Sequence, residues 1–317
     1  MGELSRGKER LLRRLGDRKG RAREGLVLVE GRRAVGAALA AGARFRFALL
    51  ARGASAPDQE VAQELDEAGV EVLEVEKQEL AEFADTESPQ DLLAVAEEPT
   101  SELPARRGAV VSGEGFAGDR APRPTRPADR SLEEASHREI PPGEVGRGEV
   151  ILVLDAVQDP GNVGTLIRSA VALGADRVLA LDGTVDPWNP KVVRSSAGLV
   201  FRIPIHRLEL ARALDWIESR GLALLVADAS GIDVRRWLRQ VGGEVGEVRP
   251  GSGFALVLGN EGAGPRSEAV DRATALVALP LEEGVDSLNV AMAGTLLLWA
   301  LGPGAGDTPA DQPPGDR

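Results

Sequence analysis

Short apolar runs alternate along the first hundred positions with segments whose apolar residues recur at helical spacing. Runs of strand length lie at Leu26–Val29, Phe45–Leu50, Val70–Val75 and Leu92–Ala96. Between them, residues 34–41 and 59–68 have the spacing of amphipathic helices. Strands that alternate with helices predict a small α/β domain over residues 1–97.

The same alternation returns at Val150 and is sharper there. Six further runs indicate strands at Val150–Leu154, Arg177–Leu181, Phe201–Ile205, Leu222–Ala227, Phe254–Leu258 and Ala275–Leu279. Segments with helical spacing, such as residues 208–219, separate most of them. Runs that are apolar throughout are typical of strands buried on both faces. The pattern therefore predicts an α/β domain over residues 149–303, with a mostly parallel sheet covered by helices on both sides.

The composition changes between these two series. Residues 98–148 are rich in proline, glycine and charge and contain few large apolar side chains. Such a segment cannot bury enough apolar surface to order itself, so it is predicted to be a flexible linker. Residues 304–317 have no packing pattern and are expected to form a disordered tail.

Composition also excludes several kinds of chemistry. The chain of 317 residues is 43% apolar, which is enough for two cores. It has no cysteine, so thiol catalysis and cysteine zinc sites are excluded. Its two histidines, His137 and His206, lie outside any catalytic pattern. No apolar run approaches the roughly 20 residues of a membrane span, and we expect a cytoplasmic protein without membrane contact.

The net charge of −12 argues against a nucleic-acid partner, but the distribution of charge argues for one. Basic residues crowd the first two dozen positions: Arg6, Lys8, Arg10, Arg13, Arg14, Arg18, Lys19, Arg21 and Arg23. The acidic residues concentrate between Asp58 and Glu98 and in the tail. A local basic patch binds phosphate backbones even on an acidic protein. The alternative is a solvated basic arm with no partner.

The strongest candidate chemistry lies in residues 254–301. One predicted strand ends at Gly259, and the glycines of the loop that follows let the backbone approach a ligand. A second strand ends at Pro280, and Ser287 then resembles the start of a helix. Two strand ends and one helix N-terminus therefore converge, as they do where α/β sheets bind ligands.

Taken singly, these features have ordinary explanations. The turn at 161–164 fits neither the P-loop nor the G-x-G-x-x-G dinucleotide fingerprint and serves equally as a tight strand-to-helix turn. Arg168 alone resembles a surface arginine, Glu261 a solvated loop acid and Ser287 a helix cap. A nucleotide-dependent α/β enzyme such as a dehydrogenase is one alternative function, although the acidic ribose partner of such enzymes is missing at the expected place.

Read together, five blocks occur in a fixed order. They are N-x-G-x-x-x-R (Asn162, Gly164, Arg168), R-S-S-A-G (194–198), L-G-N-E-G-x-G (258–264), L-P-L (279–281) and S-L-N-V-A (287–291). Residues 149–301 thereby resemble the SpoU/TrmH family of RNA ribose 2′-O-methyltransferases, in the SPOUT superfamily. Residues 1–97 resemble the family's N-terminal substrate-binding domain, a ribosomal-protein-like α/β fold, with the best match at residues 28–31.

This resemblance implies a parallel sheet whose C-terminal part is tied in a deep trefoil knot. It implies a homodimer that binds S-adenosylmethionine (AdoMet) in the knot loops and needs no metal. The implied cofactor contacts are Gly259, Leu279 and Leu288, completed by Leu258, Asn260 and Pro280. The implied catalytic positions are Asn162, Arg168, Glu261, Ser287 and Asn289. Ala291 departs from the family pattern, since many relatives carry serine there, and the linker is longer than expected.

The implied reaction makes these residue types reasonable. A ribose 2′-OH is a weak acid, and an arginine stabilises the developing alkoxide or an adjacent phosphate. With a pKa above about 12, we expect Arg168 to act electrostatically rather than as a base. In related enzymes this arginine can serve the partner subunit's site. The expected substrate is ribosomal RNA, because a separate N-terminal domain resembles that of ribosomal-RNA enzymes. The alternatives are transfer RNA and an inactive RNA-binding assembly factor.

Overall fold

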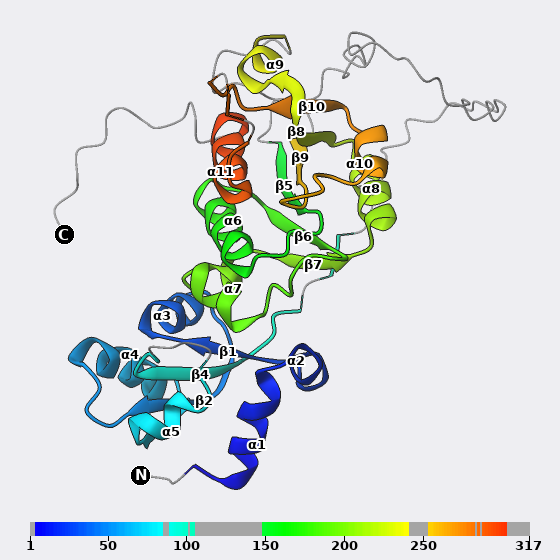
Figure 1. Ribbon diagram of the computed structural model, residues 1–317. Coiled ribbons are helices and arrows are strands. Elements are labelled where there is room, and N and C mark those ends of the chain that lie inside the picture. The colour runs from blue at the N-terminus through cyan, green and yellow to red at the C-terminus, as the bar shows by residue number, and fades with distance from the viewer. Residues whose placement is uncertain are drawn as a thin grey trace.

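The computed structural model describes residues 4–84, 89–100, 102–104, 148–240, 253–282, 284–285 and 287–302. Most of the predicted linker at 98–148 and all of the predicted tail at 304–317 lie outside the described residues. Within this part of the chain, two sheets and their covering helices form two packed regions, which Figure 1 shows one above the other.

The N-terminal region contains a four-stranded sheet in the order β1-β4-β2-β3. Its strands are β1 (Leu26–Glu30), β2 (Phe45–Ala51), β3 (Glu71–Val75) and β4 (Leu92–Glu97). Strand β4 runs antiparallel to β1 and β2, whereas β3 runs parallel to β2. The helices are α1 (Arg6–Leu15), α2 (Arg18–Glu24), α3 (Arg32–Ala40), α4 (Ala56–Glu67) and α5 (Lys77–Ala81). The four predicted strands are confirmed, with ends shifted by a single residue.

Each face of this sheet has its own apolar core. Helices α3 and α4 bury Val35, Ala38 and Leu65 on one face. Helices α1 and α5 bury Leu12, Leu15 and Leu80 on the other. Local signals fix the ends of the first two helices, because the Ser5 and Asp17 side chains accept hydrogen bonds from the first turns of α1 and α2.

The C-terminal region contains a six-stranded parallel sheet in the order β10-β8-β9-β5-β6-β7. Its strands are β5 (Glu149–Leu154), β6 (Arg177–Leu181), β7 (Ile205–Leu208), β8 (Ala223–Asp233), β9 (Gly253–Leu258) and β10 (Ala275–Ala278). Its helices are α6 (Pro160–Ala172), α7 (Pro190–Ser195), α8 (Leu210–Ser219), α9 (Val234–Gln240), α10 (Ser267–Asp271) and α11 (Val290–Leu301), with a 3-10 turn η2 (Leu199–Arg202).

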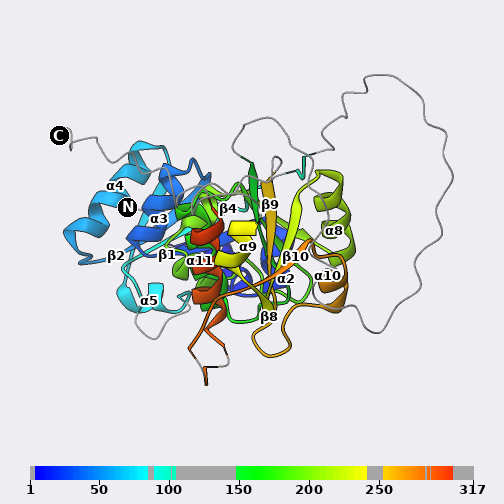
Figure 2. The same ribbon diagram turned by 90° about the horizontal axis from the view of Figure 1, so that it is seen from above.

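Helices cover both faces of this sheet, as its continuous apolar strands predict. Helices α8 and α10 lie on one side and α11 on the other (Figure 2). Strands β5 and β9 at the centre are buried along almost their whole length, and their residues face two separate cores. The predicted α/β class and parallel sheet are therefore confirmed, while the trefoil knot stays a prediction. No helix in the described part of the chain is long and apolar enough to cross a membrane.

Two predicted elements are wrong in position. The run predicted as a strand at 201–205 is the turn η2, and strand β7 begins only at Ile205. Pro204 has no N–H to donate to a ladder, so pairing with β6 starts after it. Phe201 instead packs its ring beside Trp188, with centroids 5.4 Å apart.

The final helix also begins later than the sequence predicts. Ser287 is not its cap. Helix α11 begins at Val290, and the Asn289 side chain accepts hydrogen bonds from the backbone N–H groups of its first turn.

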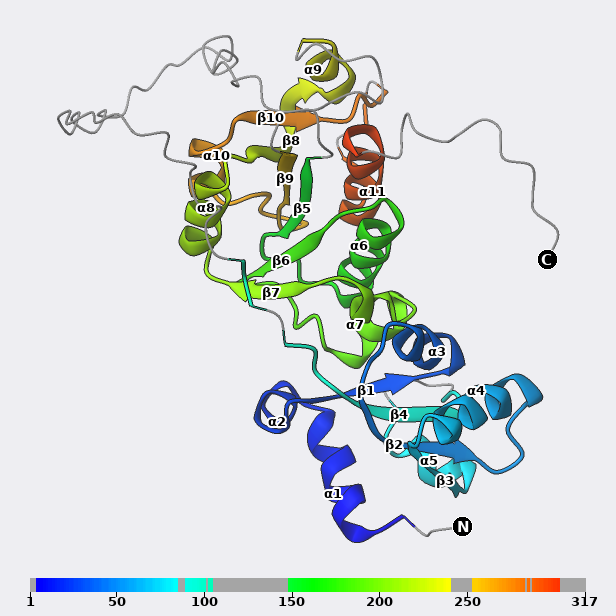
Figure 3. The ribbon, with the colours of Figure 1, turned by 180° about the vertical axis from the view of Figure 1, so that it is seen from behind.

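The two regions contact each other through buried groups. Helix α3 lies beside η2, and α7 lies beside β1 (Figure 3). At Gly198, whose φ is +80°, a Cβ atom would lie 2.4 Å from the Ala34 carbonyl oxygen, so only glycine permits this approach. Arg21 of α2 forms an ion pair of 2.6 Å with Asp186, and Arg194 of α7 pairs with Glu30 at 3.1 Å. The interface is therefore held together both by close backbone packing and by ion pairs.

Candidate functional site

A cavity of about 600 Å³ opens at the carboxyl edge of the parallel sheet. Four segments line it: the middle of β8, the loop after β9, the end of β10 and the start of α11. The last three of these segments are those whose convergence the sequence predicts. The cavity lies within the range of roughly 300 to 1,000 Å³ that is typical of small-molecule sites.

Most of the predicted site residues line this cavity. They are Leu258, Gly259, Asn260, Leu279 and Leu288 from the cofactor set and Glu261, Ser287 and Asn289 from the catalytic set. Pro280, Asn162 and Arg168 are not among the lining residues. Ala227 and Asp228 in the middle of β8 also line the cavity, and the sequence analysis missed this wall. Its only sequence signal was an acidic residue directly after the apolar run predicted at Leu222–Ala227.

The loop after β9 is held in one shape by its own backbone. Asn260 and Gly264 exchange two backbone hydrogen bonds of 3.1 and 2.9 Å. The Asn260 side chain donates to the Ala156 carbonyl oxygen and accepts from the N–H groups of Gly262 and Ala263, each at 2.9 Å. A Cβ atom on Gly259 would lie 2.1 Å from the backbone nitrogen of Pro265. Glycine is therefore required at the point where the strand meets the cavity.

Glu261 is the acceptor at the centre of a hydrogen-bond network. Its Oε1 accepts from Asn162 Nδ2 at 3.0 Å, and its carboxylate also accepts the backbone N–H groups of Gln158 and Asp159. Partial burial acts to raise the pKa of Glu261, but these hydrogen bonds outweigh it and hold the pKa below its ordinary value. Glu261 is thus a carboxylate at neutral pH and is suited to orient its neighbours.

Asn162 and Asn289 extend the network to two helix starts. Asn289 Nδ2 donates to Asn162 Oδ1 at 3.0 Å, and Asn289 Oδ1 accepts the N–H of Ala291 at 2.9 Å. The chain Glu261–Asn162–Asn289 therefore ties the loop after β9 to the first turns of α6 and α11. Three predicted catalytic residues from separate blocks of the sequence are in direct contact.

Ser287 lies exposed at the cavity, two residues before the cap of α11. It forms no hydrogen bond with any residue that the structure describes.

Arg168 is set apart from the rest. It is exposed on α6, six residues beyond Asn162, which corresponds to about 9 Å along the helix axis. Within the described part of the chain it forms no ion pair. The structure therefore does not bring Arg168 into the cavity of its own chain.

The R-S-S-A-G block serves packing. Ser195 of α7 lies so close to α6 that a Cβ atom on Gly164 would fall 1.9 Å from its Oγ. Ser196 is fully buried, and its Oγ donates to the Val193 carbonyl oxygen. This block and Gly164 bring α6 and α7 together, and α6 carries the N-x-G-x-x-x-R residues.

Arg266 is a further residue that the sequence analysis missed. It follows the loop after β9 and donates from Nε to Asp155 Oδ1 at 2.6 Å, while its guanidinium also reaches Asp182. Asp155 is fully buried directly after β5. Arg266 thereby anchors the cavity loop to two strand ends. A charged residue directly after a buried strand was the available signal.

The basic N-terminal residues divide into two groups. Lys8, Arg13 and Arg14 pair with acidic residues of the same region, and Arg21 is only 2% exposed. Arg6, Arg10, Arg18 and Lys19 form no ion pair with a described residue. No cluster of His, Asp or Glu in the described ranges could hold a metal ion.

Comparison with known proteins identifies both regions. Residues 149–299 match the model of the SpoU rRNA Methylase family, and residues 9–94 match the MRM3-like substrate binding domain. The chain is 36% identical over 162 residues to the 23S rRNA (guanosine(2553)-2′-O)-methyltransferase RlmP of Bacillus subtilis, which covers 51% of this chain and 61% of that protein. It is 29% identical to the mitochondrial rRNA methyltransferase 3A of Danio rerio, over 88% of this chain and 64% of that protein. The chain therefore spans less than two thirds of these two relatives.

A solved structure extends the match to nearly the whole chain. The AdoMet-bound rRNA methyltransferase from Sinorhizobium meliloti superposes with a TM-score of 0.67 at 25% identity, over 95% of this chain and 96% of that one. The two family models cover separate parts of the chain, and this likeness joins them in one fold. Together with the ordered sequence blocks, these matches show that residues 149–299 form a domain of the SpoU rRNA methylase family.

Proposed function

We propose that the protein transfers a methyl group from AdoMet to a ribose 2′-OH of ribosomal RNA. The observation that carries this proposal is the contact of Glu261, Asn162 and Asn289 beside a cavity walled by Gly259, Leu279 and Leu288. These residues come from the separate motif blocks of the family. The names of the relatives support the same reaction, since one is a 23S rRNA 2′-O-methyltransferase and the other an rRNA methyltransferase.

The cavity suits AdoMet in size and in chemistry. Leu258, Leu279 and Leu288 offer apolar walls for an adenine ring, and the glycine loop exposes backbone groups that discriminate its edge. Pro280 follows Leu279 directly and fixes the backbone there. When bound, AdoMet supplies a methyl group on a sulfonium centre that needs only an aligned nucleophile, so no metal is required.

Each polar residue then has a distinct task. Glu261 stays ionised and holds the Asn162 side chain, and Asn162 in turn holds Asn289 at the start of α11. Ser287, exposed beside them, is placed to hydrogen-bond the incoming ribose. Arg168 keeps its charge throughout and stabilises the alkoxide that develops on the 2′-oxygen.

A homodimer completes this site. On α11, Met292, Leu296 and Trp299 are 60%, 44% and 54% exposed and recur at helical spacing, which makes one apolar face. Helix α6 packs against α11 and is joined to it by the Ser169–Thr295 hydrogen bond of 2.7 Å. A second copy seated on this face would lie beside α6. Arg168, outside its own cavity, is proposed to act in the partner subunit's site.

The N-terminal region of residues 1–97 is proposed to hold the RNA, and residues 149–303 to carry the reaction. The unpaired basic residues of α1 and α2 support this division, as does the match to a substrate binding domain. We also propose a cytoplasmic location, with which ribosomal RNA as the substrate is compatible. Transfer RNA is the second candidate, and the test below separates the two.

The test is transfer of labelled methyl from AdoMet to purified ribosomal RNA and, separately, to transfer RNA, followed by alkaline digestion. A 2′-O-methyl group removes the hydroxyl that cleaves the adjacent phosphodiester, so the product survives as an alkali-resistant dinucleotide. Label in dinucleotides from ribosomal RNA is the expected result. Label in mononucleotides would mean base methylation. Label only in transfer RNA would mean that transfer RNA, not ribosomal RNA, is the substrate. Cofactor binding without label on any RNA would favour an assembly factor.

A further inference from the structure

A second cavity, of about 420 Å³, lies between the two regions of the chain. Helix α2 forms one wall, and the carboxyl ends of β6 and β7 with the start of α8 form the other. Three arginines line it: Arg18 from α2, Arg207 from β7 and Arg212 from α8. No motif of the methylase family includes them.

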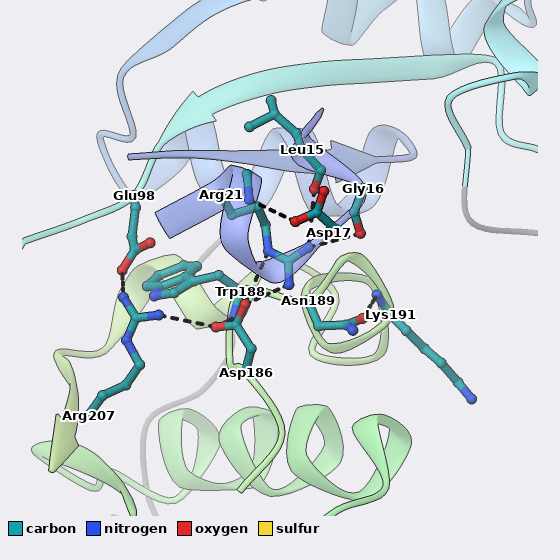
Figure 4. Close-up of polar contacts among 11 residues, drawn as sticks. Leu15, Gly16, Asp17, Arg21, Glu98, Asp186, Trp188, Asn189, Lys191 and Arg207 are labelled. Carbon is teal, nitrogen blue, oxygen red and sulfur yellow. Dashed lines mark hydrogen bonds and ion pairs between the residues drawn. The ribbon is translucent and has the colours of Figure 1, made fainter. Parts of the chain in front are cut away.

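The cavity is framed by a buried ion pair between the regions (Figure 4). Arg21 donates from Nε and Nη2 to one carboxylate oxygen of Asp186, at 3.1 and 2.6 Å, and both side chains are at most 4% exposed. Arg21 Nη1 also donates to the carbonyl oxygens of Leu15 and Gly16. The guanidinium thus clamps the α1–α2 turn to the loop after β6.

The acidic groups at the cavity are mostly engaged. Asp186 accepts from Arg21 and, at 3.3 Å, from Arg207, which also pairs with Glu98. Asp182 accepts from Arg266, and this hydrogen bond holds the pKa of Asp182 below its ordinary value, so it stays a carboxylate.

The arginines at the cavity outnumber the acidic groups that remain to pair with them. Arg18 and Arg212 are exposed at the cavity and form no ion pair with any described residue. Glu209, at the start of α8, is the one other acidic lining residue, and it also forms no ion pair in the described part of the chain. Two guanidinium groups therefore face the cavity with a single unpaired carboxylate beside them. Guanidinium groups bind phosphate through paired N–H donors.

Both cavities lie along one edge of the same sheet. The first sits at the carboxyl ends of β10 and β9 and the middle of β8, and the second at the carboxyl ends of β6 and β7. Strands β9 and β6 are separated only by β5, which puts their ends roughly 10 Å apart. Arg266 spans this interval, since it follows the loop of the first cavity and contacts Asp182 of the second.

We propose that the interdomain cavity binds a backbone phosphate of the substrate RNA, through Arg18 and Arg212, next to the nucleotide that enters the cofactor cavity. The inference rests on the proposed function. Phosphate contacts position a nucleic acid without reading its sequence. The two arginines, one from each region, therefore set the register of the RNA strand relative to the site.

The test compares two double variants of equal charge. Arg18→Ala/Arg212→Ala removes the proposed contacts. Arg33→Ala/Arg236→Ala is the control, because both arginines are exposed and form no ion pair with a described residue. Arg33 lies on α3, on the opposite face of the N-terminal sheet from α1, and α9 with Arg236 lies far from α2 (Figures 1 and 3).

Binding of protein-free ribosomal RNA is measured over a series of KCl concentrations. The first variant should raise the Kd about tenfold near 0.1 M salt and reduce the slope of log K against log salt by about 0.7, the value for one lost phosphate contact on a single strand. In methyl transfer its KM for RNA should rise while kcat and AdoMet affinity stay within about twofold. The control variant should match the wild type in every measurement, and Arg18→Lys/Arg212→Lys should recover part of the slope.

Two results would overturn the proposal. One is an unchanged Kd and salt slope in the first variant, and the other is a loss of kcat at unchanged KM. Competition by millimolar inorganic phosphate without a change in the RNA slope would assign the cavity to a free anion instead. If the wild type itself neither binds nor methylates ribosomal RNA, the proposed function fails, which is a distinct outcome.

Discussion

The cofactor cavity and the joint between the two regions lie on the same sheet edge but are held by different forces. Around the cavity, neutral amides, backbone groups and glycine packing fix most of the shape, with Glu261 and the Arg266–Asp155 ion pair as the charged members. At the joint, buried charges do this work, above all Arg21 and Asp186. Uncharged hydrogen bonds keep their geometry over a wide range of pH and salt.

Under the proposed function, the joint positions the RNA, whereas the cavity binds AdoMet and carries the reaction. At Gly259 the packing of the loop leaves no room for an added methyl group. At the joint, loss of one charge of the Arg21–Asp186 pair would leave the other charge buried without its partner. Breaking the joint should therefore affect stability and RNA placement first. Altering the cavity should affect AdoMet binding or turnover while leaving the joint intact. The predictions below test that separation.

The largest effect is expected from Asp186→Asn. This change leaves the Arg21 guanidinium buried without its counter-charge, which typically costs 3–5 kcal/mol, so we expect the free energy of unfolding to fall by about 3 kcal/mol. Urea denaturation measures it. Glu71→Gln is the control, because its pair with Lys8 has the same 2.6 Å length but is exposed. That variant should lose less than about 1 kcal/mol. Equal losses in the two variants would mean that the buried pair contributes no more to the free energy of unfolding than the exposed pair.

Arg168→Ala should lower kcat by about 10²- to 10³-fold, because one stabilising donor to the developing alkoxide is lost. AdoMet affinity, measured by calorimetry, should not change, because Arg168 does not line the cavity. Loss of cofactor binding would contradict the role given to it.

Mixing tests whether the arginine acts across the dimer. Arg168→Ala subunits combined with subunits inactivated in the cofactor loop should recover about a quarter of wild-type activity, since half of the dimers are mixed and each has one intact composite site. No recovery would place Arg168 in the site of its own subunit.

Gly259→Ala should weaken AdoMet binding by about 10- to 100-fold. The added methyl group would lie 2.1 Å from backbone that has no room to move, and overpacking of this kind costs about 1–3 kcal/mol. Gly262→Ala is the matched control in the same loop, where the nearest atom lies 3.7 Å away. Calorimetry should show near wild-type affinity for the control. Equal affinity in both variants would mean that the loop rearranges freely.

Sequence predicted the apolar strands and the cavity loops because both depend on local signals. Gly259 and Asn260 directly follow a continuous apolar run, so their place at a strand end was readable. The cap of α11 was misplaced because serine and asparagine both cap helices, and the choice of Asn289 depends on its contact with Asn162, 127 residues away.

The joint could not be predicted in the same way. Arg21 stands among nine basic residues that look alike in the sequence, and only the fold buries it against Asp186, 165 residues along the chain. The separation of Arg168 from its own cavity is likewise a property of α6 in three dimensions. The sequence shows how many basic residues the segment contains. Which of them is buried, and with which acidic residue it pairs, depends on tertiary packing.

The smallest effect is expected from Glu261→Gln, which should lower kcat/KM by about tenfold. Glutamine keeps an acceptor for Asn162, but its amide would face a backbone N–H that the carboxylate now accepts from Gln158. The folded pKa of Glu261 lies below its ordinary value of 4.5, so the stabilisation by the carboxylate is complete above pH 4.5 and is lost only as the pH falls through that lower value. The ratio of wild-type to variant kcat/KM should therefore be constant from about pH 6 to pH 9. A ratio that varied across this range would make Glu261 a proton-transfer group, and the cavity, like the joint, would then depend on a titrating charge.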